Sequence, residues 1–381
     1  MVRKLQLRFQ AQSRAELRFL FMEQAKKRVD WVDYAKGICI ILVVAMHTTL
    51  GIEKATGGLS GLHGFIDWAR PFRMPDFFLI SGLFLASRID RPWRNYFDSK
   101  VIHFAYFYVL WMSIQFLLKG HDIFLQDGIS GLFTAYLNGF VEPFGTLWFI
   151  YMLAVFFFVT KMLRSVSPLL VFACAAVLEA CTKTGTIATG HTIIDEFAAR
   201  YVYFFAGFWL ARHVFNLAAD VDRRSALQIF VGLLVWGAAN FIMVQSGLSV
   251  QPGISLAMGF VGAGAVIASG VLLSKFKFAA ALRYCGENSI VIYLAFFLFM
   301  AVTRALLLRY VPELGLSVIA AITTAAGVSG PLMLFWATRH TKLSFLFQRP
   351  AWAKLPVDQA GPRQNRLRSE KLIENNNLGR F

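Results

Sequence analysis

Residues 31–51 read WVDYAKGICIILVVAMHTTLG, and this stretch decides the class of fold. Asp33, Lys36 and His47 are its only acidic, basic or imidazole side chains, and the rest is mostly apolar. An α-helix of about 20 such residues spans the ~30 Å hydrocarbon core of a bilayer. The stretch therefore predicts a transmembrane helix that carries a few titratable groups into the membrane.

The composition of the whole chain points the same way. Of its 381 residues, 57% are hydrophobic and only 16% are charged, 38 are Phe, and the mean hydropathy is +0.56. Soluble domains carry about 25% charged residues. This excludes a disordered chain, a collagen-like repeat, a disulfide scaffold and a water-soluble enzyme, and it predicts an all-α, polytopic integral membrane protein.

Apolar stretches of suitable length recur along the chain. We predict ten transmembrane helices, at about Trp31–Gly51, Trp68–Ser87, Val101–Leu118, Phe144–Leu163, Pro168–Cys181, Phe197–Phe215, Ala226–Ser246, Ile254–Ser274, Ser289–Leu308 and Leu316–Thr338. The fifth is short and is interrupted by Glu179. Between the third and fourth, Gly128–Val141 is typical of a short re-entrant or interfacial helix.

The basic residues test this topology. The net charge is +16, and 30 of the 38 Lys and Arg residues fall in segments on one side of the ten predicted helices. Cytoplasmic loops of membrane proteins are enriched in Lys and Arg. The distribution therefore predicts that both termini are cytoplasmic, and it explains the positive charge without a nucleic-acid partner.

The chain divides by composition into three parts. Residues 1–30 form a basic cytoplasmic N-terminal arm, either a surface helix on anionic headgroups or a partly ordered tail. Residues 31–338 form the membrane domain, and 339–381 form a basic, polar cytoplasmic tail that we expect to be disordered. We expect no signal peptide and no internal repeat. The four cysteines lie in or beside apolar stretches, so we expect neither a disulfide nor a metal site.

Two polar residues of the first predicted helix, Lys36 and His47, form the sharpest candidate site. Eleven residues make about three turns, so the two side chains share a helix face with a rise of ~16 Å between them. Titratable residues inside a membrane are costly to bury and are often functional. A cation near the cytoplasmic edge and an imidazole deeper in suit an elongated anionic donor, although a histidine that only packs helices together is the alternative.

The second predicted helix begins with charged residues and prolines, Arg70-Pro-Phe-Arg73-Met-Pro-Asp76. We expect the prolines to break or kink the start of the helix and to free backbone groups for a cavity. Arg73 and Asp76 could form a structural ion pair. Asp76 could instead orient His47, as carboxylates do for catalytic imidazoles.

Two later helix starts also carry polar groups. Glu142 lies at the outer interface, where it could hold an acceptor, and Trp148 follows it as either a substrate contact or an interfacial aromatic. At the start of the ninth helix, we expect Asn288 and Ser289 to be helix caps. Glu179 and Asn240 are expected to form hydrogen bonds between helices.

The chain contains no phosphate-binding loop, dinucleotide fingerprint, zinc-protease motif or nucleophile elbow. Two classes of function remain beside an enzyme. Titratable residues in the membrane also suit a proton-coupled transporter or flippase, although no internal symmetry of two halves is visible. A structural or sensory membrane protein would leave the pairing of Lys36 and His47 unexplained.

Four motifs in order resemble the acyltransferase 3 family of integral-membrane O-acyltransferases. They are Asp33-Tyr-Ala-Lys36-Gly-Ile followed by His47, Met74-Pro-Asp-Phe-Phe-Leu-Ile-Ser81-Gly82, Leu147-Trp148-Phe149, and Gly286-Glu-Asn-Ser289-Ile-Val-Ile-Tyr293. The resemblance covers about residues 31–338. It implies transfer of an acyl group, acetyl or succinyl, from cytoplasmic acyl-CoA to a hydroxyl of an extracytoplasmic glycan. The localisation expected from this is a multi-pass protein of the bacterial inner (cytoplasmic) membrane, with no permanently bound cofactor.

The resemblance also implies roles for individual residues. The family signature of a basic residue, ten residues and an essential histidine matches Lys36 and His47, with His47 as general base or acyl carrier and Asp76 as its orienting carboxylate. The expected contacts to CoA are Lys36, Arg88, Arg91 and Arg94, and those to the acceptor are Arg70, Arg73, Glu142 and Trp148. Relatives commonly carry a second histidine shortly after the residue equivalent to Tyr293, and this chain has Leu294-Ala-Phe296-Phe instead.

Overall fold

A computed structural model describes residues 29–356, apart from the side chains of residues 119, 121, 122 and 277. In that part of the chain every regular element is helical and no strand occurs, which confirms the predicted all-α class. The predicted N-terminal arm lies almost wholly outside the described residues. The α-helices are α2 (Asp30–Thr56), α3 (His63–Leu83), α4 (Trp93–Phe97), α5 (His103–Asn138), α6 (Trp148–Met162), α7 (Pro168–Lys183), α8 (Thr192–Trp209), α9 (Ala211–Asp222), α10 (Ala226–Gln245), α11 (Ile254–Ser274), α12 (Ala280–Glu287), α13 (Ser289–Tyr310) and α14 (Leu316–Thr338).

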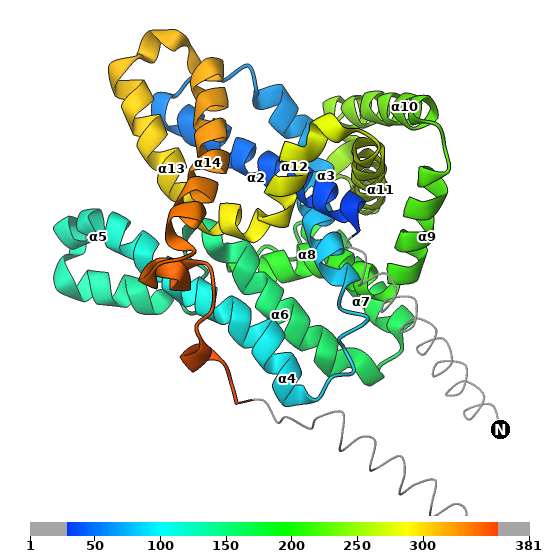
Figure 1. Cartoon of the computed structure of the whole chain (residues 1–381), viewed down its shortest axis with the longest axis horizontal. Coiled ribbons are helices and arrows are strands. Elements are labelled where there is room, and N and C mark those ends of the chain that lie inside the picture. The colour runs from blue at the N-terminus through cyan, green and yellow to red at the C-terminus, as the bar shows by residue number, and fades with distance from the viewer. Residues whose placement is uncertain (1–28, 357–381) are drawn as a thin grey trace, which may run out of the picture.

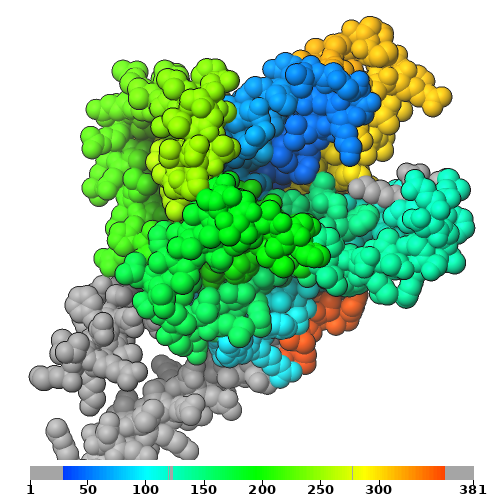
Figure 2. All heavy atoms as spheres, turned by 180° about the vertical axis from the view of Figure 1, so that it is seen from behind, coloured from blue at the N-terminus to red at the C-terminus, as the bar shows by residue number. Residues whose placement is uncertain are grey.

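Helix α2 lies at the centre of the molecule. It contacts α3, α11, α12, α13 and α14, and more than half of its residues are buried. In Figure 2 the α2–α3 region, in blue, lies between a yellow-green group of helices around α10 and α11 and a yellow to orange group formed by α13 and α14. The helix that carries Lys36 and His47 is therefore surrounded by protein over most of its length.

Seven helical segments of the described chain are long and apolar enough to cross a membrane, fewer than the ten predicted. They are Asp30–Thr56, Trp93–Leu118, Gly145–Ser165, Ala226–Gln245, Ile254–Ser274, Ser289–Tyr310 and Leu316–Thr338. The other three predicted spans correspond to α3, α7 and α8. Helix α7 has only 16 residues, and α3 and α8 each carry several charged side chains.

Helices α3 and α8 pack closely against each other, although each carries several charged side chains. A Cβ on Gly82 of α3 would overlap the carbonyl oxygen of Phe204, and a Cβ on Gly207 of α8 would overlap the carbonyl oxygen of Leu79. Small residues allow the backbones of membrane helices to approach in this way. The contact brings the charged faces of both helices into the interior.

Two predicted helix boundaries differ from the structure. The sixth predicted span, Phe197–Phe215, is divided at Leu210 into α8 and α9. The second begins earlier, at His63, and continues through Pro71 and Pro75 instead of starting after a break. Each proline lacks an N–H donor, so two carbonyl groups of the helix lose their usual hydrogen-bond partner. The helix therefore depends on packing against its neighbours to remain continuous.

Helix α5 is a hairpin of two helical arms, seen in cyan in Figure 1. The backbone turns at Gly128, which has a φ of 67°, a value that glycine adopts at little energetic cost. The Ser113 and Tyr136 hydroxyls, one from each arm, lie 3.0 Å apart, and the ring of Phe116 packs against that of Tyr136. The second arm corresponds to the helix predicted at Gly128–Val141.

The beginning of the predicted disordered tail is instead packed against the rest of the protein. Short 3-10 helices form at Lys342–Leu346 and Ala351–Ala353. Between them Arg349 forms a 2.6 Å ion pair with Asp98, and both side chains are buried. Asp98 also accepts a hydrogen bond from the backbone N–H of Leu355. Residues 357–381 lie outside the described chain.

Polar side chains within the helices join neighbouring helices, as predicted for two of them. The Asn240 amide of α10 donates to the carbonyl oxygen of Trp68 at 2.7 Å. The Ser255 hydroxyl of α11 donates to Glu179 of α7, also at 2.7 Å. Each contact pairs a buried polar group with one on a neighbouring helix, although the second carboxylate oxygen of Glu179 has no hydrogen-bond partner in the described chain.

Candidate functional site

Two cavities meet in the interior beside α2. The first, here called the lysine cavity, has a volume of about 250 Å³ and receives Lys36 from α2 and Lys100 from a π-helix at Asp98–Ile102. The remaining lining residues are Cys39, Phe77, Ile80, Ser81, Phe84, Phe104, Phe149, Leu153, Phe157, Gly286, Glu287, Ser289 and Ile290. The cavity is thus an apolar channel with two cations and one carboxylate at its wall.

The cations of the lysine cavity belong to a larger basic group. Lys36 lies 3.7 Å from Asp33 and is one third exposed, and the Nζ of Lys100 lies 4.4 Å from the centre of the Phe157 ring. Arg88 and Arg91 are exposed in the segment that follows α3, close enough to Lys100 to add to the positive potential there. Burial lowers the pKa of Arg88, and the charge of Arg91 adds to this shift. Such a concentration of positive charge attracts phosphates.

The motif around Gly286 shapes the floor of this cavity. A Cβ on Gly286 would overlap the carbonyl oxygen of Asp33 on α2, so only glycine permits this approach of α12 to α2. The close packing brings Glu287 and Ser289 to the cavity wall beside Lys36. Asn288 is the N-cap residue of α13, as predicted, but neither it nor Ser289 forms a side-chain capping hydrogen bond, and the amide of Asn288 donates to the carbonyl oxygen of Tyr284 instead.

The second cavity, here called the histidine cavity, has a volume of about 200 Å³. It is lined by Val43, Met46, His47, Arg73, Met74, Phe77, Trp148, Phe149, Glu196, Arg200 and Tyr293. Of the predicted site residues, His47, Arg73 and Trp148 therefore come together here. Lys36 lies on the same helix as His47 but lines the other cavity.

The imidazole of His47 rests on an aromatic ring and presents its nitrogens to the cavity. Its ring centre lies 5.4 Å from that of Phe296. Within residues 29–356 neither ring nitrogen has a hydrogen-bond partner. The nitrogens are therefore available to a substrate hydroxyl, as general-base catalysis requires.

Charged residues of α3 and α8 surround His47. Arg73 is only 6% exposed, and its guanidinium donates one hydrogen bond, to the carbonyl oxygen of Ile66 at 3.3 Å. Arg200 forms an ion pair with Glu196, one turn earlier on α8, with Nε and Oε2 3.0 Å apart. The cavity thus contains two arginines and one carboxylate.

Two phenylalanines, Phe77 and Phe149, line both cavities and therefore form the partition between them. Their rings are edge-to-face, with centres 4.6 Å apart. Tyr293 fixes one of them, because its hydroxyl accepts from the backbone N–H of Phe149 at 3.1 Å and donates to the carbonyl oxygen of Thr146 at 2.5 Å. A reactive group that moves from one cavity to the other must pass these rings.

The sequence predicts that Asp76 either orients His47 or pairs with Arg73. In the structure it does neither. Its side chain is fully buried, and neither carboxylate oxygen has a hydrogen-bond partner in the described chain. It does not line either cavity.

Arg70 and Glu142 are held by other parts of the protein. Arg70 is largely exposed and pairs with Asp67 at 2.5 Å. Glu142 accepts two hydrogen bonds from the backbone N–H of Thr192, at 3.0 and 3.2 Å, and so stabilises the start of α8. Arg94 lies exposed on α4, outside both cavities. The structure places none of these three residues at a cavity wall.

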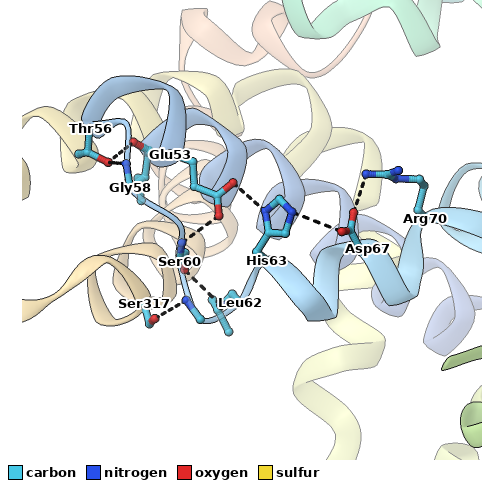
Figure 3. A network of polar contacts seen from close by, with 11 residues as sticks. Glu53, Thr56, Gly58, Ser60, Leu62, His63, Asp67, Arg70 and Ser317 are labelled. Atoms are coloured by element: carbon cyan, nitrogen blue, oxygen red, sulfur yellow. Dashed lines mark hydrogen bonds and ion pairs between the residues drawn. The ribbon is translucent and has the colours of Figure 1, made fainter. Parts of the chain in front are cut away.

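Figure 3 shows the polar network to which Arg70 belongs. Glu53 at the end of α2 contacts His63 Nδ1 at 2.9 Å, and His63 Nε2 lies 3.3 Å from Asp67, the partner of Arg70. Glu53 also accepts the backbone N–H of Ser60 at 3.0 Å. The network fixes the turn between α2 and α3 and thereby the relative positions of His47 and Arg73.

Comparison with known proteins identifies the family of the chain. A family described as an acyltransferase domain matches residues 29–336, which is most of the chain and includes both cavities. The chain belongs to the acyltransferase 3 family. This confirms the resemblance seen in the sequence motifs, and the protein is a multi-pass membrane member of that family.

One curated relative supports the membrane assignment of this acyltransferase family member. The chain is 24% identical over 224 residues to the inner membrane protein YcfT of Escherichia coli (strain K12). The match covers 53% of this chain and 62% of YcfT, so the chain spans less than two thirds of that relative's length. No solved structure matches the chain.

The family motifs alone do not reveal several residues of this acyltransferase site. Lys100, Glu196, Arg200 and Ser289 reach the cavities, and the sequence patterns assigned them to topology, to unassigned charges or to capping. The sequence gives a signal for only two of these residues. Glu196 and Arg200 are four residues apart and therefore share one face of a mostly apolar helix. Their direction depends on the packing of α8 against α3.

A larger hollow of the described surface lies elsewhere and does not fit acyl transfer. It has a volume of about 530 Å³, lies between α10 and α11, and has Arg224 as its one charged lining residue. Its other lining residues, apart from Gln228, are apolar or small. It contains no base or nucleophile and lies beside α10, the most exposed of the candidate spans. We therefore assign the site to the two cavities beside α2.

Proposed function

We propose that the protein is a membrane O-acyltransferase that moves an acyl group from cytoplasmic acyl-CoA to a hydroxyl of an extracytoplasmic glycan. One observation supports this most strongly. Two cavities of different chemistry, one with lysines and one with a histidine, meet at a partition of two aromatic rings beside a single helix. Such an arrangement lets a donor and an acceptor approach from opposite sides.

In this proposal the lysine cavity binds the donor. The phosphates of CoA contact Lys36 and Lys100, with Arg88 and Arg91 adding to the attraction near the cavity mouth. The pantetheine arm lies along the aromatic and aliphatic wall, which is apolar enough to receive it. The thioester then reaches the partition at Phe77 and Phe149.

The histidine cavity receives the acceptor. A ring nitrogen of His47 takes the proton of a sugar hydroxyl, and the hydroxyl oxygen attacks the thioester carbon. The carbon–sulfur bond breaks, the new ester stays with the sugar, and the CoA thiolate takes up the proton. Because His47 lines the acceptor cavity and not the lysine cavity, the general-base role is favoured over a covalent acyl-histidine.

The proposed topology places the Lys36 end of α2 in the cytoplasm and both termini on that side. Helices α3, α7 and α8 complete ten membrane segments, with the charges of α3 and α8 turned toward the cavities. The excess of Lys and Arg on one side of the ten segments supports this orientation. The same reasoning places the protein in the bacterial inner membrane, as YcfT is an inner membrane protein.

The test uses the full-length protein in lipid nanodiscs with radiolabelled acetyl-CoA and an extract of cell-envelope glycans. We expect label in the glycan and release of free CoA. The variant His47→Ala should reduce transfer by about 10²- to 10⁴-fold, the usual contribution of a general base, while its binding of acetyl-CoA stays within a few-fold of the wild type. Transfer by His47→Ala at the wild-type rate would contradict the proposal.

The same experiment separates an enzyme from a transporter or flippase. A carrier would move acyl-CoA or glycan across the bilayer of a proteoliposome without covalent transfer. The partition of Phe77 and Phe149 would then act only as a gate. Movement of intact substrate with no labelled ester would favour the carrier.

A further inference from the structure

Arg73 is a buried cation without a carboxylate partner. It is 6% exposed, forms no ion pair in the described chain, and its Nε atom has no hydrogen-bond partner. It nevertheless lines the histidine cavity beside His47. A buried charge is costly unless an opposite charge accompanies it, so an anionic group of a ligand in this cavity would stabilise the guanidinium.

A second arginine, Arg200, faces the same cavity and has a replaceable partner. Its ion pair with Glu196 joins two residues of one helix, and both side chains are about one quarter exposed. Partly exposed ion pairs within one helix contribute little stability. An incoming anion can therefore replace Glu196 as the partner of Arg200 with little loss of stability.

The position of Arg200 is set by the start of α8. Glu142 accepts the backbone N–H of Thr192, which anchors the helix end two turns before Arg200. Trp148 closes the cavity nearby with an apolar surface. Arginines held in this way can bind a carboxylate or phosphate with good geometry.

We propose that the histidine cavity selects an acceptor sugar that carries an anionic group, a carboxylate or a phosphate, which binds between Arg73 and Arg200 and turns a neighbouring hydroxyl toward His47. The proposal rests on the proposed acyl transfer and names its substrate class. Glu196 is the internal competitor for Arg200 and is displaced by the acceptor.

The anion belongs to the acceptor and not to the acyl group. A charged acyl group such as succinyl would have to carry its carboxylate past the rings of Phe77 and Phe149. Desolvating a carboxylate between apolar rings is costly. An uncharged acyl group passes without this cost, whereas the acceptor's anion never crosses the partition.

The size of the cavity agrees with a single sugar unit. Its volume of about 200 Å³ is below the range of about 300–1,000 Å³ that is typical of sites for larger ligands. The lining combines aromatic surface from Trp148 and Tyr293 with charged groups from α3 and α8. The cavity can therefore hold one residue of a glycan while the rest extends outward.

The first experiment compares acceptors. Full-length protein in nanodiscs is given labelled acetyl-CoA with methyl glucuronoside, glucose 6-phosphate or neutral methyl glucoside. We expect kcat/KM for at least one anionic sugar to exceed that for the neutral sugar by about 10- to 100-fold, the effect of a hydrogen-bonded charge. The ratio between the two anionic sugars distinguishes a carboxylate from a phosphate. Equal or better transfer to the neutral sugar overturns the inference and leaves the proposed function intact.

A second comparison uses the two partners on α8. Arg200→Gln should lower kcat/KM for the anionic sugar by about tenfold more than for methyl glucoside, and so largely remove the preference. Glu196→Gln, the matched control, should strengthen the preference because Arg200 loses its competitor. If the ion pair were only structural, both variants would lose activity with every acceptor to the same extent, which would contradict the proposal.

Two further arms separate this inference from the proposed function. Equilibrium binding of labelled methyl glucuronoside, measured without acyl-CoA, should weaken in Arg200→Gln even if no transfer occurs; such binding without transfer supports the anion site and rejects the acyltransferase. Succinyl-CoA in place of acetyl-CoA should give slower transfer. A preference for succinyl-CoA that Arg200→Gln abolishes would assign the arginines to the donor and overturn the inference.

Discussion

The lysine and histidine cavities share two rings of one wall but hold their charges in different ways. The cations of the lysine cavity are lysines on flexible stems, with Lys36 one third exposed and Arg88 and Arg91 exposed nearby. In the histidine cavity Arg73 is buried and Arg200 is held by Glu196. Lysine is a strongly hydrated point charge, whereas arginine presents a planar, weakly hydrated fork.

The difference indicates how each cavity treats its ligand. Exposed lysines and arginines attract a highly charged molecule over a distance and release it readily. A buried arginine fork fixes the orientation of a single group. The first cavity is therefore suited to capture and the second to positioning, and three further sets of variants test this contrast.

The largest effect is expected from the lysine cavity. Lys36→Ala and Lys100→Ala should each raise the KM for acetyl-CoA by about tenfold, and the double variant by about 100-fold, because each removes a charged contact to phosphate. The kcat should change little, since the chemistry takes place in the other cavity. Steady-state kinetics in nanodiscs measures both constants.

Lys54→Ala is the matched control for these variants. Lys54 is exposed at the opposite end of α2, and its removal should leave both constants unchanged. An unchanged KM in the Lys36 and Lys100 variants would remove their assigned role as donor contacts.

An intermediate effect is expected from the segment after α14. Arg349→Ala leaves the buried Asp98 unpaired and should cost about 3–5 kcal/mol of stability, seen as a lower Tm. Asp98 begins the π-helix that carries Lys100, and π-helical turns often occur at functional sites. The KM for acetyl-CoA should therefore also rise, by no more than in Lys100→Ala.

Lys354→Ala, a change of an exposed residue in the same segment, is the control for Arg349→Ala. A normal Tm in Arg349→Ala would show that the ion pair does not hold the segment. A lower Tm with an unchanged KM would separate the stability of the segment from the position of Lys100.

The smallest effect is expected at the partition. Phe149→Leu keeps an apolar side chain but loses the edge-to-face contact with Phe77, worth about 0.5–1.5 kcal/mol. Water should then reach the thioester more often, so the ratio of acetyl-CoA hydrolysis to transfer should increase while total CoA release falls little. Phe158→Ala, a change of an exposed ring on the same helix, should not alter the ratio, and an unaltered ratio in Phe149→Leu would show that the rings do not exclude water.

Much of the fold is visible in the sequence because hydropathy alone marks the helices that face lipid. The predicted bounds of Ile254–Ser274 and Leu316–Thr338 agree with α11 and α14. The break between α8 and α9 at Leu210 was missed, because the apolar run continues through it. Helices α3 and α8 fall outside the helices that length and composition alone mark as able to cross a membrane, because each carries several charged side chains; of these, Arg73, Glu196 and Arg200 line the histidine cavity.

The site was predictable where a spacing along one helix defines it. Lys36 and His47 share α2, so helix geometry relates them without any tertiary information. The role predicted for Asp76 has no support in the structure, since a change of one position rotates a side chain by 100° and the sequence does not say which neighbour it meets. Arg200 reaches the cavity only because glycines bring α8 close to α3, which no local pattern predicts.

The partition of Phe77 and Phe149 also has an electrical consequence. A bacterial membrane carries a voltage, and each elementary charge that crosses it gains or loses about 2.3 kcal/mol per 100 mV. Two polar cavities that joined freely would conduct protons and ions and short-circuit that voltage. The paired rings act as an insulator, because a hydrated ion would have to lose its water to pass them. In the proposed reaction, a neutral acyl group would therefore cross the partition while the membrane keeps its voltage.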